Sequence, residues 1–239
     1  MNINIVYSGY VRTLFHSFPI TVSTIRNIHP NAKINVFGSF WKTSYGRSDR
    51  LNDPWHFVVE NYQQNIEDLT QDGIECRLTN LDSSIHTIKV EFIDTLIQKN
   101  LYNEGTTIGL SPAHMMCKFY LTKKSIDLVP NVQGDSLFLI TRPDVILNRF
   151  PCTKDVKDSE LILSKYGWYM AEGRNGFENE MMWIATNRQM AEKTCDIISA
   201  LRHEKIPKED MFAESVYGRY FHQLTSKISR FDFDYRIPR

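Results

Sequence analysis

Arginine and aspartate follow directly after an apolar run in the middle of the chain. Residues 137–141 (LFLIT) have the composition of a buried β-strand, and Arg142, Pro143 and Asp144 come next. At such a position a carboxylate can bind a divalent cation that also contacts diphosphate oxygens, and an arginine can offset diphosphate charge directly. A salt-bridged surface turn is the alternative, and these residues alone do not distinguish the two.

A second polar group follows the N-terminal run 2–7 (NINIVY), which is typical of a strand. Ser8 and Gly9 come directly after this run, and Arg12 lies near the start of the next segment. Glycine lets a ligand approach the backbone, a helix start offers N–H groups to an anion, and arginine can bind phosphate with two N–H groups. The pattern matches neither GxGxxG nor GxxxxGK[ST], so by itself it favours a tight turn with a solvated arginine.

Carboxylates also precede a later apolar run. Glu178 and Glu180 flank Asn179 just before residues 181–185 (MMWIA), which predict a strand. A carboxylate at this position can act as a general base toward an acceptor hydroxyl, or can orient that hydroxyl. The alternative interpretation, a polar loop before a strand, is common.

The other elements predict a single α/β domain over residues 1–239. A strand at 2–7, a helix from Leu14 to Ile25 with a kink or restart at Pro19, and a strand at 34–40 form a βαβ opening, which favours a mostly parallel central sheet flanked by helices. A long polar loop follows at 41–55. We predict further strands at 74–78, 137–141, 161–164, 181–185 and 231–235, and further helices at 62–69, 85–103, 111–126, 187–201 and 208–224.

Three of the polar groups fall at the carboxyl ends of predicted strands. Residues 8–12 follow the first strand, Trp41 and Lys42 follow the second, and residues 142–144 follow the central one. Ligands of open α/β sheets bind outside the carboxyl ends of the strands. We therefore expect the three groups to meet at one edge, which favours a ligand site more strongly than any group does alone.

Composition and charge narrow the class of protein. The 239 residues include 28 basic and 28 acidic side chains, and a net charge of zero gives no overall field that attracts nucleic acid or an anionic membrane. No apolar run approaches the roughly 20 residues that cross a bilayer, and no charged leader opens the chain. The four cysteines form no CxxC pair, which favours a reduced protein. We expect a soluble, cytoplasmic protein with no nucleic-acid partner.

Several of these motifs together resemble one family. Residues 8–13 (SGYVRT) resemble the SGxxRT opening of a group of glycosyltransferases with a GT-A-like (nucleotide-diphospho-sugar transferase) fold, found in polysaccharide clusters and large DNA viruses. The resemblance continues at Trp41 and in the helix that contains Lys118. It is closest at residues 141–144 (TRPD), where better-known GT-A enzymes carry Asp-x-Asp.

Two positions depart from the family pattern. Glu180 follows Asn179 where the family has aspartate, and Tyr10 stands where the family has glutamine. The longer side chain of Glu180 changes where its carboxylate can reach.

The resemblance implies transfer of a sugar from a nucleotide-diphospho-sugar donor to a hydroxyl of a glycan, glycoprotein or glycolipid acceptor. It implies a donor-binding half at 1–147 and an acceptor-side half at 148–239. Asp144 and Glu180 become the candidate catalytic residues, with Asp144 as a ligand of Mn²⁺ or Mg²⁺. The residues that the resemblance assigns to donor binding are Ser8, Gly9, Tyr10, Arg12, Trp41, Lys118 and Arg142.

Two other functions use a similar sheet. A nucleotidyltransferase also binds a metal through carboxylates, but it would usually carry a glycine- and lysine-rich phosphate loop after the first strand. A glycan-binding or scaffold domain on a degenerate transferase fold is the second alternative, and Arg142 in place of a first carboxylate keeps it open.

Overall fold

The structure is a computed structural model that describes residues 1–11, 13–42, 70–108, 110–131, 135–165, 182–203 and 213–237. The strands of its central sheet are β1 (Asn2–Gly9), β2 (Lys33–Trp41), β3 (Thr87–Ile93), β4 (Ser136–Thr141), β6 (Leu161–Ser164), β7 (Met182–Ala185) and β8 (Ile228–Phe231). These seven strands lie in the order β3-β2-β1-β4-β7-β6-β8. A second sheet pairs β5 (Ile146–Leu147) with β9 (Tyr235–Arg236).

The central sheet is mostly parallel. Strands β1 to β4 run in the same direction, β7 is antiparallel to both of its neighbours, and β8 is parallel to β6. The predicted α/β class with a mostly parallel sheet flanked by helices is therefore confirmed.

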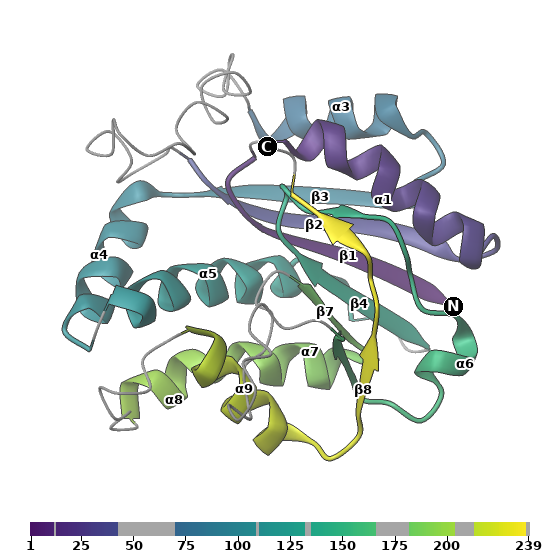
Figure 1. The fold of residues 1–239 in the computed structure, drawn as a ribbon. Coiled ribbons are helices and arrows are strands. Elements are labelled where there is room, and N and C mark those ends of the chain that lie inside the picture. The colour runs from purple at the N-terminus through teal and green to yellow at the C-terminus, as the bar shows by residue number, and fades with distance from the viewer. Residues whose placement is uncertain are drawn as a thin grey trace.

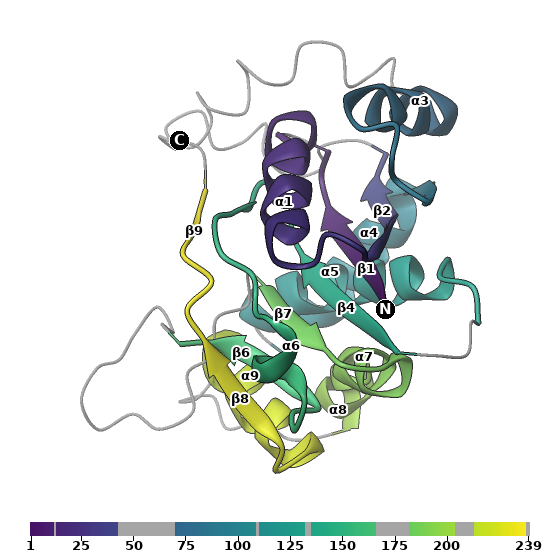
Figure 2. The ribbon, with the colours of Figure 1, turned by 90° about the vertical axis from the view of Figure 1, so that its right-hand side faces the viewer.

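Helices cover both faces of the sheet (Figures 1 and 2). One face is covered by α1 (Leu14–Ile28) and α3 (Gln71–Leu81). The other face is covered by α5 (Leu110–Asp127), α7 (Arg188–Cys195), α8 (Ile197–His203) and α9 (Ala213–Leu224). Helix α4 (Thr95–Thr106) packs against α5, and α6 (Thr153–Val156) is a single short turn.

The central strand β1 lies between two hydrophobic clusters. Ile3 and Ile5 belong to the cluster that includes Phe18 of α1, whereas Val6 belongs to the cluster that includes Phe119 of α5. Both faces of a parallel sheet are covered by helices, so its inner strands bury the side chains that point to either face. This is why the N-terminal run is apolar over most of its length.

Helix α1 is continuous through Pro19, so the predicted restart of the helix is not seen. A proline inside a helix removes one backbone hydrogen bond. The apolar stripe on α1 recurs at helical spacing and is fully buried against the sheet, which offsets that loss. The stripe consists of Leu14, Phe18, Val22 and Ile25.

The structure corrects two predicted elements between β2 and α4. Residues 74–78, predicted as a strand, lie in α3, where Ile74 and Leu78 are one turn apart and both fully buried. Residues 87–93, predicted as part of a helix, form β3, in which apolar residues alternate along the strand. In both places the apolar spacing over a short segment was assigned to the wrong period.

Most other predicted elements are confirmed within a few residues. The strands at 137–141, 161–164 and 181–185 correspond to β4, β6 and β7, and the helix predicted at 111–126 is α5. The helix predicted to open at Asn187 ends at Cys195, because α8 is a separate helix. The strand predicted at 231–235 is wrong for residues 232–234, which lie between β8 and β9. The helix predicted at 62–69 and most of the loop at 41–55 lie outside the described residues.

Two further expectations concern membranes and cysteines. Within the described part of the chain, no helix is both long and apolar enough to span a bilayer. All four cysteines are free thiols, as the spacing of the cysteines predicted.

Cysteine reactivity is expected to follow burial. Burial raises the pKa of the Cys117 thiol to about 12 and also raises the pKa of Cys195, whereas Cys76 is exposed. At pH 8 the two buried thiols stay protonated, and only the thiolate reacts. A thiol reagent followed by mass spectrometry should therefore label Cys76 rapidly in the native chain and spare Cys117 and Cys195. All four should react in denaturant, and equal native rates for Cys76 and Cys117 would contradict the expectation.

Candidate functional site

The carboxyl ends of the parallel strands meet at one edge of the sheet, on the left in Figure 1 beside α4. In the register of the sheet, Tyr7 pairs with Thr141, and Trp41 pairs with Ile93. The antiparallel strand β7 begins at the same edge, because Met182 also pairs with Thr141. The three polar groups that follow β1, β2 and β4 therefore lie along one edge, as their positions in the sequence predicted.

The turn after β4 is held against β1 and α1. Gly9 adopts a φ of +138°, which favours glycine, and a Cβ atom built there would lie 3.5 Å from Cδ of Pro143. The Ser17 hydroxyl of α1 donates a hydrogen bond of 2.5 Å to the Pro143 carbonyl. The backbone of Gly9 and the turn at 142–144 are thus direct neighbours.

Arg142 and Asp144 form a two-point ion pair. Nε of Arg142 donates to Oδ1 of Asp144 at 2.8 Å, and Nη2 donates to Oδ2 at 2.5 Å. The Asp144 side chain is 9% exposed and that of Arg142 is 25% exposed. A bidentate pair of this kind fixes the plane and direction of the guanidinium. Asp144 therefore orients Arg142 at the end of β4.

These contacts do not fit a divalent cation on Asp144. Both carboxylate oxygens already accept hydrogen bonds from Arg142. A cation that used the remaining lone pairs of this carboxylate would lie beside the positive charge of the guanidinium, which disfavours its binding. Among the described residues, no group of three His, Cys, Asp or Glu side chains is placed to hold a metal ion. The geometry of this site gives Asp144 a positioning role toward Arg142.

Hydrogen bonds fix α5 to the ends of β1 and β2. The Thr122 hydroxyl donates to the Ser8 hydroxyl at 2.9 Å. The Ser125 hydroxyl donates to the Tyr7 carbonyl at 2.7 Å and accepts from the Ser39 N–H at 2.8 Å. Ser8 is 1% exposed, so its side chain holds α5 in place and is not accessible to a ligand.

Lys118 lies on α5 one turn from the residue that contacts the end of β1. Thr122 contacts Ser8, and the helix continues toward lower residue numbers for one more turn, about 6 Å at 1.5 Å per residue, to reach Lys118. Its Nζ lies 5.3 Å from the centroid of the Trp183 ring and 5.6 Å from that of Tyr217. Cation–π attraction of this kind holds an ammonium group over aromatic faces. The fold therefore brings Lys118 to the predicted edge.

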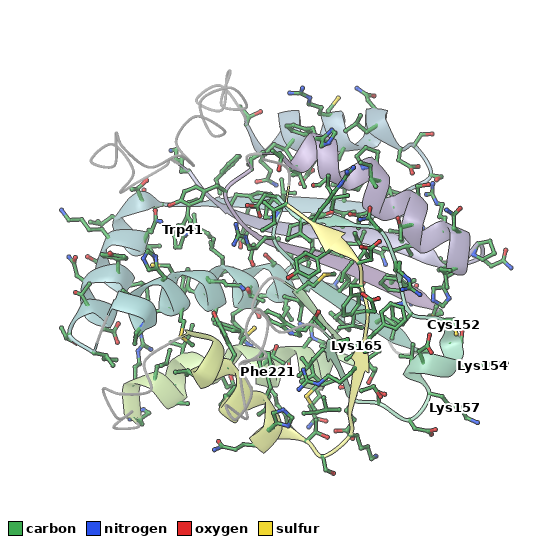
Figure 3. All side chains as sticks on the ribbon, in the orientation of Figure 1. Trp41, Cys152, Lys154, Lys157, Lys165 and Phe221 are labelled. Atoms are coloured by element: carbon green, nitrogen blue, oxygen red, sulfur yellow. The ribbon has the colours of Figure 1, made fainter. Side chains whose placement is uncertain are left out.

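Trp41 and Tyr10 brace the helices at this edge. Trp41 is 3% exposed and stacks on Tyr120 of α5 with 6.3 Å between ring centroids and 8° between ring planes. Figure 3 labels Trp41 between α4 and the sheet. The Tyr10 hydroxyl accepts a hydrogen bond of 2.6 Å from Nε2 of Gln98 in α4. Both aromatic side chains connect strand ends to helices, and Trp41 has little surface left for a ligand.

Two predicted site residues, Arg12 and Glu180, lie outside the described residues, as do Glu178 and Asn179. Met182, where β7 begins, pairs with Thr141, the residue before Arg142.

Comparison with known proteins shows that this chain resembles solved structures in its fold. No protein-family model and no curated protein sequence matches this chain. A crystal structure of the galactosyltransferase LgtC, in complex with donor and acceptor sugar analogs, matches over 96% of this chain and 73% of LgtC, with a TM-score of 0.52 and 12% identity. The chain has a GT-A-like fold. The glycosyltransferase GlyE of Streptococcus pneumoniae TIGR4 matches over 97% of this chain and 46% of GlyE, with a TM-score of 0.41 and 11% identity.

The sequence patterns did not predict the residues that hold the helices and the turn after β4 at this edge of the sheet. Ser17, Thr122 and Ser125 are short polar side chains on helix faces that are otherwise apolar, and all three are fully buried. A buried hydroxyl needs a hydrogen-bond partner. A polar residue within an apolar helical stripe thus indicates a buried hydrogen bond to another element. Its spacing does not indicate which strand it contacts.

Proposed function

We propose that this protein is a glycosyltransferase that moves a sugar from a nucleotide-diphospho-sugar to a hydroxyl of a glycan, glycoprotein or glycolipid. The observation that carries the proposal is the guanidinium of Arg142, held by Asp144 at the carboxyl end of β4, in a turn whose Pro143 lies beside Gly9. The fold shared with LgtC, which was solved with donor and acceptor sugar analogs, supports the same classes of ligand here.

The chemistry needs positive charge where the donor breaks. Cleavage between the sugar and the diphosphate leaves negative charge on the departing diphosphate. Hydrogen-bond donors that are already in position stabilise this charge, because the protein does not have to reorganise in the transition state. Two of the five N–H groups of Arg142 bond to Asp144, which sets the direction of the other three. We assign Arg142 to the diphosphate and Lys118 to a second contact with the donor.

The other predicted site residues take supporting roles in this proposal. The backbone at Ser8 and Gly9 and the side chain of Tyr10 border the nucleotide, and Trp41 keeps α5 against the strand ends. Arg12 is assigned to the nucleotide. Glu180 is assigned to the acceptor hydroxyl as its base or orienting group, so that residues 1–147 form the donor half and 148–239 the acceptor half.

Donor binding is expected not to depend on a divalent cation. Mn²⁺ or Mg²⁺ would supply the same charge compensation as an arginine, but the contacts of Asp144 do not fit a cation. The dissociation constant for the preferred nucleotide-sugar, measured by calorimetry, should agree within about twofold in excess EDTA and in Mn²⁺. A requirement for Mn²⁺ would show that the cation is held by other groups.

A panel of UDP-, GDP- and dTDP-sugars tests the function itself. Calorimetry should find one class of donor that binds, and product analysis should find slow hydrolysis of that donor without an acceptor. Absence of binding by every donor would overturn the transferase proposal. Binding without hydrolysis or transfer would instead identify a degenerate nucleotide-sugar-binding domain, and nucleotide transfer would identify a nucleotidyltransferase.

A further inference from the structure

A cavity of about 290 Å³ lies at the amino ends of the parallel strands, the edge opposite to the candidate site. This edge is on the right in Figure 1, beside the N-terminus. Strand β1 has eight residues, so the two edges are roughly 23 Å apart at about 3.3 Å per residue. The cavity is therefore separate from the donor site, and its size is near the lower end of small-molecule pockets, about 300–1,000 Å³.

The floor of the cavity is polar because of the strand register. Asn4 pairs laterally with Asn35 on one side and with Phe138 on the other. Asn4 is 4% exposed and Asn35 is 7% exposed, although parallel strands usually place Val or Ile at buried positions. A buried amide is costly unless it is hydrogen-bonded. A pair of asparagines in the middle of the sheet therefore needs an explanation beyond packing.

The two amides satisfy each other only in part. Nδ2 of Asn35 donates to Oδ1 of Asn4 at 3.0 Å. No hydrogen bond to a described residue is seen for the remaining donor, Nδ2 of Asn4, or the remaining acceptor, Oδ1 of Asn35. Both residues line the cavity, and neither atom is among the fully buried atoms that lack a partner. The cavity is thus where one donor and one acceptor stay open to a ligand.

The rim of the cavity is cationic. Lys33, at the start of β2, and Arg188, at the start of α7, line it, and the described lining residues include no carboxylate. Arg188 uses Nε for Glu192 and Nη1 for the Val129 carbonyl, which leaves Nη2 outside these two bonds. Lys33 is exposed and forms no ion pair with a described residue. An anionic group therefore suits the rim, and a hydrogen-bonding group suits the floor.

We propose that this cavity binds a phosphate monoester of a small polar ring compound. The phosphate would contact Lys33 and Arg188, and a ring substituent would pair with the open amide groups of Asn4 and Asn35. Sugar phosphates and nucleoside monophosphates share this chemistry. The proposal is independent of the transferase function, because none of these residues lies at the donor edge.

The test uses calorimetry on the full chain with a hexose phosphate, a nucleoside monophosphate and inorganic phosphate as separate probes. At least one ester is expected to bind one to one, and Lys33→Ala and Asn35→Asp should each weaken it about tenfold or more, the first by removing charge and the second by adding an anion. Lys157→Ala is the matched control, since Lys157 is exposed after α6 (Figure 3) and is not among the residues that line the cavity.

Arg142→Ala separates this site from the donor site. Ester binding at the cavity should be unchanged in Arg142→Ala and weakened about tenfold or more in Lys33→Ala. Loss in Arg142→Ala alone would place the ester at the donor edge and overturn the proposal. So would the absence of ester binding at millimolar concentration, or equal affinity for inorganic phosphate. Should Asn35→Asp fail to fold, the exposed Lys33 decides the outcome.

Discussion

Arg142→Ala is expected to lower kcat/KM for sugar transfer by about 100- to 1,000-fold. This is the usual effect of removing one pre-positioned hydrogen-bond donor from the negative charge that develops in a transition state. The guanidinium donates two hydrogen bonds to a nearly buried carboxylate, so its direction is set before the sugar donor arrives. Steady-state kinetics with the donor identified by the panel measures the change. Most of the loss should appear in kcat, because the diphosphate gains charge in the transition state.

Two variants separate this role from a structural one. Arg142→Lys keeps the charge but not the two-point geometry, so it should recover only a small part of the activity. Arg149→Ala removes a more exposed arginine that pairs with Asp232, and it should leave kcat/KM within about twofold. Because Arg142→Ala removes the two hydrogen bonds that the nearly buried Asp144 accepts from Arg142, unfolding curves must accompany the kinetics. Near-normal activity in a folded Arg142→Ala variant would refute the assignment.

Trp183→Ala is expected to lower the free energy of unfolding by about 3–5 kcal/mol. Trp183 of β7 is fully buried, and its ring centroid lies 5.7 Å from that of Phe119 in α5 and 5.3 Å from that of Phe221 in α9. Its truncation leaves a cavity between the sheet and these two helices. Urea unfolding followed by circular dichroism measures the loss, which is large against a typical stability of about 5–15 kcal/mol.

Trp183→Phe should cost much less, about 1 kcal/mol. The Trp183 Nε1–H is buried without a partner among the described residues, and phenylalanine removes this unsatisfied group while it keeps an aromatic ring. Leu96→Ala, at a side chain that is largely exposed on α4, serves as the control and should change stability by less than about 0.5 kcal/mol. Equal losses of stability in Trp183→Ala and Leu96→Ala would contradict a core packing role for Trp183.

Some elements could be predicted from local pattern because the pattern was long or well bounded. The run that forms β1 and the run that forms β4 are apolar and end at polar residues, and the stripe of α1 repeats over more than three turns. Residues 74–78 and 87–93 were assigned wrongly because each is short enough to fit either period. Neighbouring elements, rather than local spacing, decide such segments.

The sequence by itself determined that the polar groups after β1, β2 and β4 share one edge, because parallel strands place their carboxyl ends together. It placed Lys118 on the helix before β4, but not over Trp183. Only the tertiary structure decided that Asp144 faces its own arginine and that Ser17 holds the turn at Pro143 from 126 residues away.

The cavity on the opposite edge also belongs to the tertiary structure. Asn4 and Asn35 are 31 residues apart and look like ordinary polar breaks within two strands. Lateral register brings their amides together, and the start of α7 brings Arg188 to the same place. The physical reason is general: local spacing sets which side chains share a face, whereas pairing between distant segments sets which of them meet.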